Sequence, residues 1–170
     1  MRALAFLGIL IFIVPLLLVA AGQFGLLSGR APPDLGANSG KLKPPSKTDN
    51  SVSSQADDWP GSEYASEYAR IAPLAVRGDG AATMARLRTL LAEWPGATLI
   101  EDRPDYLRVE FSTRWLRFID DAEFWLDPAG RVIQVRSASR LGRKDFGVNR
   151  KRIESIRARL DSGGLMAKLE

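Results

Sequence analysis

The fold of this chain is decided by residues 119–138, which read IDDAEFWLDPAGRVIQVRSA. Two alternating runs flank the turn segment Asp127-Pro-Ala-Gly130, where proline takes a turn position that it favours. This pattern predicts a β-hairpin with strands at 119–127 and 131–138 and a two-residue connection. The connection sets the register through four predicted cross-strand pairs: Phe124 with Ile133 and Ala122 with Val135 on the core face, and Asp121 with Arg136 and Trp125 with Val132 on the other.

Further strands are predicted upstream of the hairpin. Residues 106–113 alternate apolar and polar side chains, as in a half-buried strand. Residues 97–100 predict a shorter strand, and residues 69–76 an additional edge strand.

Two helices complete the predicted domain. Asp79 can cap a helix over residues 80–94, which carries its apolar side chains on one stripe and stops at Pro95-Gly96. Residues 147–160 predict a last helix, with these side chains facing inward: Val148, Ile153, Ile156 and Leu160. The order of elements predicts an α+β fold, a small antiparallel sheet of about four strands with two helices packed on one face.

Two residue types are missing from the composition. The chain has no cysteine and no histidine. It therefore has no disulfides, no thiolate chemistry, no Ser-His-Asp arrangement and no zinc site of the usual kind. We expect no cofactor and no metal, although carboxylates alone would still suit magnesium or calcium.

The N-terminus predicts membrane targeting. Residues 3–21 carry no charge, and as a helix they would span roughly 28 Å, close to the apolar thickness of a bilayer. Residues 1–24 are a retained signal anchor or a cleaved signal peptide, and the length of the apolar run favours retention. Arg2 favours a domain on the non-cytoplasmic side. The basic residues just downstream weaken that orientation: Arg30, Lys41, Lys43 and Lys47.

Composition also sets the expected boundaries. Residues 25–61 are rich in Pro, Gly and Ser and have no apolar periodicity, which predicts a flexible linker. The alternative is that residues 52–55 and Trp59-Pro60 dock on the domain, because a lone exposed tryptophan is unusual in a spacer. Residues 62–161 form the α+β domain, and residues 162–170 are expected to be a flexible tail.

Charge is segregated along the domain. Residues 101–127 hold eight acidic and four basic side chains, net −4, and residues 131–160 hold ten basic and two acidic ones, net +8. One interpretation is that the two segments pair on the sheet and otherwise face solvent. The other is an anion-binding surface made by the start of the last helix and four basic residues: Arg136, Arg140, Arg143 and Lys144.

The hairpin contains carboxylates and serines that are candidate catalytic groups. Asp120 and Asp121 point to opposite faces of a strand, so they cannot share one site without a bulge. A buried Asp120 needs an arginine or backbone donors, which favours a structural ion pair. Ser137 and Ser139 share a face, but no histidine is present to activate them.

Several motifs resemble one family. They are RFIDDAEFWLD (117–127), VRSASRLGRKDFGVNRKRIESIRARL (135–160), IAPL (71–74), GLLSGRAPPDLG (25–36) and VSSQA (52–56). The chain resembles the bacterial and plastid family known as domain of unknown function 1499. Relatives often carry two cysteines where this chain has Pro45 and Ser51. The resemblance implies an envelope-associated protein with no assigned activity, and the matching motif contains these site candidates: Asp120, Asp121, Arg136, Ser137, Ser139, Arg140, Asp145, Asn149 and Arg150.

Three functional hypotheses follow. The first is a non-enzymatic envelope protein that binds an anionic lipid, glycan or protein partner through its basic C-terminal segment, with Arg143 added to the motif residues. The second is a divalent-cation-dependent hydrolase that uses Asp120 or Asp121. The third is a scaffold without a small ligand. Nucleic acid is disfavoured, because no aromatic residues are interleaved with the basic ones and the domain is expected outside the cytoplasm.

Overall fold

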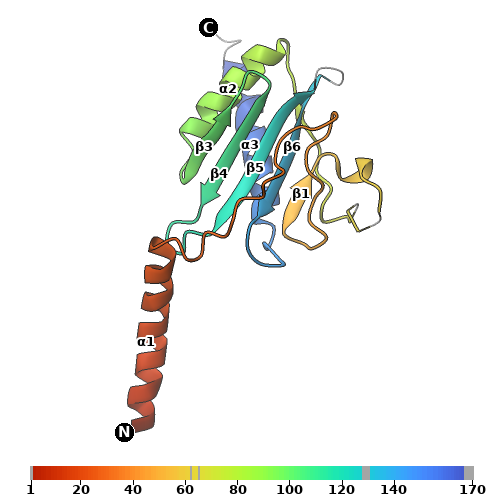
Figure 1. The fold of residues 1–170 in the computed structure, drawn as a ribbon. Helices are drawn as coiled ribbons and strands as arrows, with labels where there is room; N and C mark the ends of the chain where they lie inside the picture. The colour runs from red at the N-terminus through yellow and green to blue at the C-terminus, as the bar shows by residue number, and fades with distance from the viewer. Residues whose placement is uncertain (1, 62, 65, 128–130, 167–170) are drawn as a thin grey trace.

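One antiparallel sheet and three α-helices make up the fold, in a computed structural model that describes residues 2–61, 63–64, 66–127 and 131–166. Within these residues the sheet has six strands in the order β1-β6-β5-β4-β3, and β2 also pairs with β6 (Figure 1). The elements are α1 (Arg2–Gln23), β1 (Ser51–Ser53), the 3-10 turn η1 (Ala56–Asp58), β2 (Leu74–Ala75), α2 (Gly80–Ala92), β3 (Ala97–Asp102), β4 (Tyr106–Ser112), β5 (Ile119–Asp127), β6 (Val132–Ser139) and α3 (Val148–Met166). The α+β class and the antiparallel sheet are confirmed, but about four strands and two helices was too few.

The β5–β6 hairpin forms with a different register from the predicted one. Its pairs include Phe124 with Val135, Ala122 with Ser137, Glu123 with Arg136, and Asp127 with Val132. The partners are displaced by two residues because the connection is four residues long, not two. A shift of two leaves every side chain on its own face, so the alternating pattern could not distinguish the two registers. Residues 128–130 of the predicted turn lie outside the described part of the chain.

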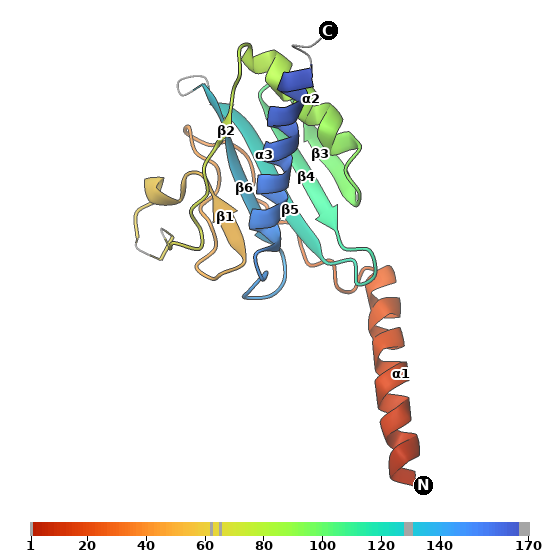
Figure 2. The ribbon, with the colours of Figure 1, turned by 180° about the vertical axis from the view of Figure 1, so that it is seen from behind.

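The helices α2 and α3 cover one face of the sheet (Figure 2). Asp79 caps α2 as predicted, since its carboxylate accepts a hydrogen bond from the backbone N–H of Ala82 at 2.8 Å. The core lies between these helices and the sheet. Its fully buried apolar side chains include Leu87, Leu107, Val109, Phe124, Val135, Ile153 and Ile156.

One prediction for the last helix was wrong. Val148 does not face inward but is 46% exposed, because it begins α3 and borders a surface hollow. The helix continues to Met166.

An irregular segment covers the opposite face of the sheet. Residues 25–50, here called the strap, run from α1 across this face and lead into β1 (Figure 1). Leu42 is fully buried, and its backbone N–H donates to the Gln55 side-chain oxygen at 2.9 Å. Composition predicted a flexible linker over residues 25–61, and in the structure strand β1 and much of the strap are held by buried side chains.

The helix α1 extends away from the domain (Figure 1). Its described side chains from Ile9 to Leu18 include large apolar groups that are 42–76% exposed. Within the described residues, no helix combines the length and the apolar content needed to cross a membrane.

Candidate functional site

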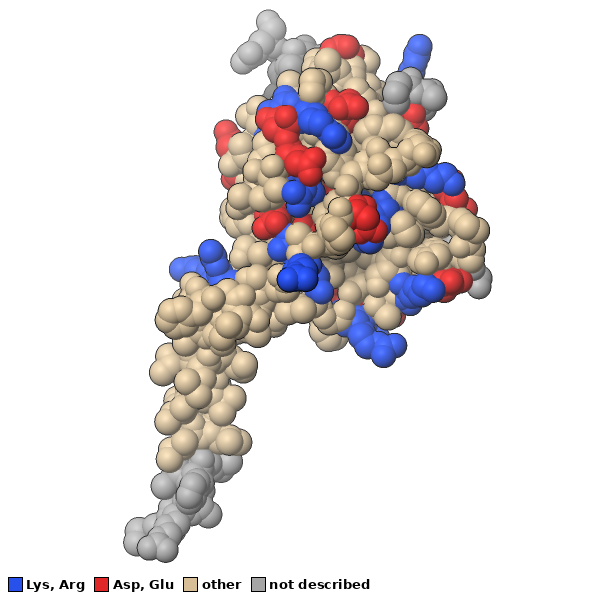
Figure 3. Space-filling model, in the orientation of Figure 1, with Lys and Arg blue, Asp and Glu red and all other residues tan. Residues whose placement is uncertain are grey.

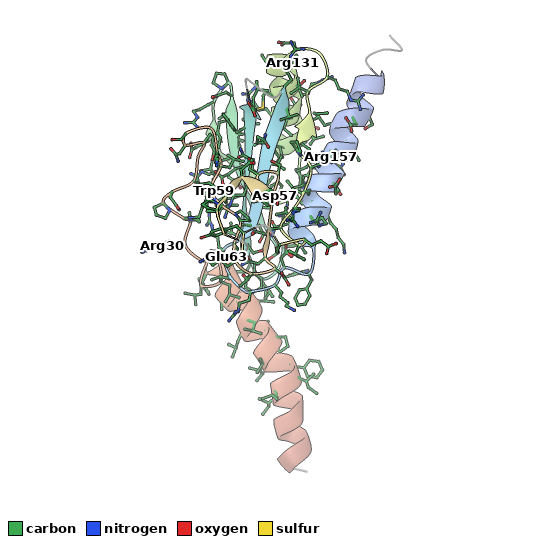
Figure 4. The ribbon with its side chains drawn as sticks, turned by 90° about the vertical axis from the view of Figure 1, so that its right-hand side faces the viewer. Arg30, Asp57, Trp59, Glu63, Arg131 and Arg157 are labelled. Carbon is green, nitrogen blue, oxygen red and sulfur yellow. The ribbon has the colours of Figure 1, made fainter. Side chains whose placement is uncertain are left out.

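A hollow of about 430 Å³ lies between the strap and the sheet. Strands β5 and β6 place Asp121, Arg136 and Arg140 on the strap face, because alternate residues of a strand share a face. The strap adds basic residues that were expected to lie in a free linker. The charged residues that line the hollow are Arg30, Lys43, Lys47, Asp121, Arg136 and Arg140. Arg30 lies near the end of the domain from which α1 leaves (Figure 4).

Arg140 is held in the hollow by two carboxylates. Its Nε and Nη2 atoms donate to the two Asp121 oxygens, each at 2.7 Å, and Nη2 also bonds to Glu110. The side chains of Arg140 and Asp121 are 6% and 2% exposed. The hydrogen bond to Asp121, with that to Glu110, raises the pKa of Arg140 above its usual value. The guanidinium is therefore permanently charged and fixed in orientation.

Arg136 pairs with Glu123, not with the predicted Asp121, because of the shift in register. Arg136 Nη1 lies 3.4 Å from Glu123 Oε2, and Arg136 Nε donates to the Pro44 carbonyl at 3.1 Å. Burial lowers the pKa of Arg136 and raises the pKa of Glu123. Glu123 also accepts hydrogen bonds from the Tyr106 hydroxyl at 2.8 Å and the Gly36 backbone N–H at 2.7 Å. Glu123 thus anchors the strap to the sheet.

The rim of the hollow carries more exposed cations. Lys43 forms an ion pair with Asp34, whose side chain is 60% exposed. Lys47 lies 3.2 Å from Glu63, and their side chains are 62% and 45% exposed. The hydrogen bond to Glu63 raises the pKa of Lys47. Arg30 makes no ion pair with any residue that the structure describes.

The other predicted residues form a polar cluster on the helix face. Arg152 from α3 donates to Asp120 at 2.5 Å and to Asn149 at 2.6 Å. This is the arginine partner that a buried Asp120 was expected to need. Ser137 donates to the Asn149 side-chain oxygen at 2.5 Å, and the Asn149 amide donates to Ser139 at 3.1 Å. Every one of these polar groups has a partner, so the cluster stabilises the junction of β5, β6 and α3.

Asp145 occupies the start of the last helix. Its carboxylate accepts hydrogen bonds from the backbone N–H groups of Gly147 at 2.9 Å and Asn149 at 3.0 Å, and from the Tyr68 hydroxyl. Burial acts to raise the pKa of Asp145, but these hydrogen bonds outweigh it and lower the pKa below the usual value. The helix start that was predicted to attract an anion is therefore already bound to a carboxylate of the chain itself.

The remaining basic candidates do not join the hollow. Arg150 donates to the backbone carbonyls of Tyr68 and Arg70 at 2.9 and 2.6 Å, and so fixes the segment before β2. Arg143 is exposed in the loop between β6 and α3. The predicted surface of Arg136, Arg140, Arg143 and the helix start is thus divided between two faces and a loop.

The two aspartates of the hydrolase hypothesis do not share one site. Asp120 faces the helices and Asp121 faces the strap, and each pairs with a different arginine. Among the described residues, no group of three carboxylate, histidine or cysteine side chains could hold a metal ion. A second hollow of about 330 Å³, lined by Asp120, Ser139 and Asp145 together with mainly apolar side chains, opens between two loops at the α1 end.

Comparison with known proteins confirms the resemblance. Residues 41–160 match the model of a family described as protein of unknown function, DUF1499. This chain belongs to the DUF1499 family. The DUF1499 match runs from Lys41 in the strap to Leu160 in α3, so it contains every charged residue of the hollow except Arg30. The chain has no significant match among curated proteins or solved structures.

Sequence reasoning missed part of the site for a physical reason. Lys43 and Lys47 were considered only as determinants of membrane orientation, because the strap has no periodic pattern that would place it on a sheet. Glu123 was not predicted as the partner of Arg136, because the predicted register paired this arginine with Asp121. Arg152 could not be assigned, since the rotation of a helix against a sheet is not encoded in its spacing alone.

Proposed function

We propose that this protein is a membrane-associated envelope protein whose domain binds an anionic group of an envelope component in the hollow beneath the strap. The observation that carries the proposal is the lining of the hollow, where five cationic side chains accompany one carboxylate, Asp121. The ligand chemistry is a phosphate or carboxylate, carried by a lipid headgroup or a glycan. The proposed activity is binding, with no chemical step.

Two cations form a rigid floor for such a ligand. Glu123 holds Arg136 and Asp121 holds Arg140, so both charges are positioned before a ligand arrives. Arg136 Nη2 makes no hydrogen bond within the described part of the chain, although Arg136 lines the hollow. An anion would give this donor an acceptor without the cost of reorganising the site.

The rim supplies exchangeable cations. Ion pairs with exposed carboxylates are weak, so a ligand anion can replace Asp34 on Lys43 and Glu63 on Lys47 at little cost. Arg30 has no acidic partner among the described residues, so a ligand anion would not have to displace a carboxylate from it. The strap therefore has two roles in the proposal: it covers the charged face of the sheet and provides three of the five binding cations.

We further propose that α1 associates with the membrane and that the domain lies on the non-cytoplasmic side, or is exported after cleavage. This rests on the uncharged run at residues 3–21 and on its exposed apolar side chains, which no part of the described domain covers. Protease added to intact cells should cleave the domain only after the outer barrier is opened. If the domain stays protected from the protease until the inner membrane is broken, the domain lies on the cytoplasmic side.

The binding proposal is tested with Arg30→Ala combined with Lys47→Ala. Both side chains are exposed at the rim, so their removal leaves the buried ion pairs intact. The full chain in zwitterionic detergent is titrated with inorganic phosphate, glycerol 1-phosphate and glucose 1-phosphate, and its melting temperature is followed. The last two probes distinguish a lipid headgroup from a glycan.

Phosphate should stabilise the parent protein beyond sodium chloride of equal ionic strength, by RT ln(1 + [L]/Kd). The double variant should lose about tenfold in affinity for each cation removed. Arg77→Ala is the matched control, because it removes an equally exposed cation that pairs with Asp161 away from the hollow. A parent protein that responds equally to phosphate and chloride would rule out the anion site.

A further inference from the structure

Exposed apolar side chains gather in two loops at the end of the domain where α1 leaves. The first loop is residues 113–118, between β4 and β5. The second is residues 141–148, which follow β6 and include the first residue of α3. Together we call them the docking loops. Five large apolar side chains in them are 36–87% exposed: Trp115, Phe118, Leu141, Phe146 and Val148. Among the described residues that follow Leu26 in the sequence, the only other exposed large apolar side chain is that of Ile100. Such clustering marks an interaction surface.

Phe146 is the most exposed of the five side chains, at 87%. It is not a mobile tip, because its neighbours are tied down on both sides: the Asp145 carboxylate and the Tyr68 hydroxyl both accept from the Gly147 N–H at 2.9 Å. Its backbone has φ of 54°, a left-handed conformation that is disfavoured for any residue with a Cβ. The loop thus presents an aromatic ring to the surroundings in a strained conformation, which is typical of functional positions.

The same loops carry cations without acidic partners. Arg114, Arg117, Arg143 and Lys144 are exposed, and none forms an ion pair within the described part of the chain. The guanidinium of Arg114 lies over the Trp115 ring, 5.0 Å from its centroid. Figure 3 shows Lys and Arg side chains around this end of the domain, beside the base of α1. Aromatic and basic side chains together are the composition that binds the interface of an anionic bilayer.

The position of α1 identifies what the loops face. The Gln23 side chain donates to the Trp115 carbonyl at 2.9 Å and to the Arg114 carbonyl at 3.4 Å. Gly22 lies so close to the loop that a Cβ there would be 2.4 Å from the Leu116 carbonyl oxygen. The C-terminal end of the apolar helix therefore packs directly on a docking loop. A bilayer that holds α1 would reach the docking loops with no further change in the chain.

We propose that the docking loops are a second membrane contact, which inserts Trp115 and Phe146 into the headgroup region of an anionic bilayer and pairs Arg143 and Lys144 with lipid phosphates. The contact orients the domain against the bilayer, so that it does not swing freely at the end of α1. This inference rests on the proposed membrane association of α1 and is independent of the anion site beneath the strap.

The absence of cysteine allows a direct test with single labels. Phe146→Cys and Trp115→Cys place an environment-sensitive fluorophore on the docking loops, and Leu16→Cys places it on α1. Arg131→Cys is the control, at the opposite end of the domain (Figure 4). The full chain is reconstituted into vesicles of phosphatidylglycerol and phosphatidylcholine, or of phosphatidylcholine alone, with brominated lipids as quenchers.

In anionic vesicles the labels at 16, 115 and 146 should be quenched and blue-shifted, and the label at 131 should not respond. Arg143→Ala with Lys144→Ala should weaken quenching at 146 by about fivefold for each cation removed, equivalent to about 1 kcal/mol per basic residue at an anionic surface. In phosphatidylcholine alone, this variant and its parent should behave alike.

Three outcomes would overturn the inference. Quenching at 16 without quenching at 146 leaves the anchor intact but removes the loop contact. No quenching at either site removes both the anchor and the contact. A label at 146 that becomes buried in detergent as protein concentration rises assigns the docking loops to a second copy of the chain. The Arg30 and Lys47 variant should leave all labels unchanged, so failure of the anion site is distinguished from failure of this contact.

Discussion

The two faces of the sheet are both covered, but the side chains buried beneath the two covers differ. Under α2 and α3 lies an apolar core with one polar cluster at its end, around Asp120 and Asn149. Under the strap lie buried ion pairs, Arg136 with Glu123 and Arg140 with Asp121. Apolar burial would stabilise the sheet without further help, whereas a buried ion pair adds little net stability over an apolar pair. This difference supports the proposal that the charges beneath the strap serve binding.

The largest effect that tests this comparison is expected from Arg140→Ala on the strap face. It would leave Asp121 and Glu110 without their cation, and breaking a buried pair in this way costs about 3–5 kcal/mol. Urea unfolding of the full chain in detergent measures the loss. Arg108→Ala, two strands away on β4, is the matched control. Arg108 pairs with a Glu101 side chain that is 39% exposed, so its removal should cost about 1 kcal/mol or less. Equal losses for the two variants would contradict a distinct, buried charged face.

A smaller loss is expected from Asn149→Ala on the helix face. Asn149 is fully buried and bonds to Ser137, Ser139 and Asp145. Its removal leaves some of these groups without a hydrogen-bond partner, which should lower the free energy of unfolding by about 1–3 kcal/mol. Thr89→Ala provides the control, since Thr89 bonds only to the exposed backbone of its own helix. If Asn149→Ala were neutral and left phosphate binding unchanged, the cluster would have neither a structural nor a binding role.

The helix face is also the part of the fold that the sequence predicts best. Alternation in residues 106–113 and 119–138 assigned β4, β5 and β6 and the face of each side chain, and Asp79 marked the start of α2. These signals are local, because they depend on the period of one element and on one cap. The register of the β5–β6 hairpin was predicted wrongly, because a shift of two residues leaves the same alternation of apolar and polar side chains. Val148 was misplaced because the spacing of a helix does not reveal where the core beside it ends.

The strap face was predicted only in part. Asp121, Arg136 and Arg140 were selected, and their common face follows from strand alternation. The strap itself was read as a free linker, since it is ordered by hydrogen bonds between irregular backbone and buried side chains, as from Gly36 to Glu123. Such bonds join residues far apart in sequence and leave no period to detect. Lys43 and Lys47 were therefore not recognised as part of a site.

The smallest expected effect is on the pH dependence of stability, and it has opposite signs on the two faces. Hydrogen bonds lower the pKa of Asp145, at the helix face, below its usual 3.8. Its contribution to stability is therefore present above that value and is lost as pH falls through the lower folded pKa. Burial raises the pKa of Glu123, under the strap, above its usual 4.5. Its contribution is present below that value and is lost as pH rises through the higher folded pKa.

Replacement of each carboxylate should therefore change the pH dependence of the unfolding free energy in opposite directions. Asp145→Asn should reduce the loss of stability on acidification below about pH 4, because the unfolded chain no longer takes up an extra proton there. Glu123→Gln should reduce the decline in stability as pH rises above about 4.5, since the folded chain no longer retains that proton. Asp102→Asn, at an exposed carboxylate paired with Arg88, controls for the loss of one negative charge. Urea midpoints measured from pH 3 to pH 8 give both slopes. If both replacements changed the slope in the same direction, the pKa of a buried carboxylate would shift in the same direction on both faces. The proposal that the strap face holds its charges for a ligand would then lose its electrostatic support.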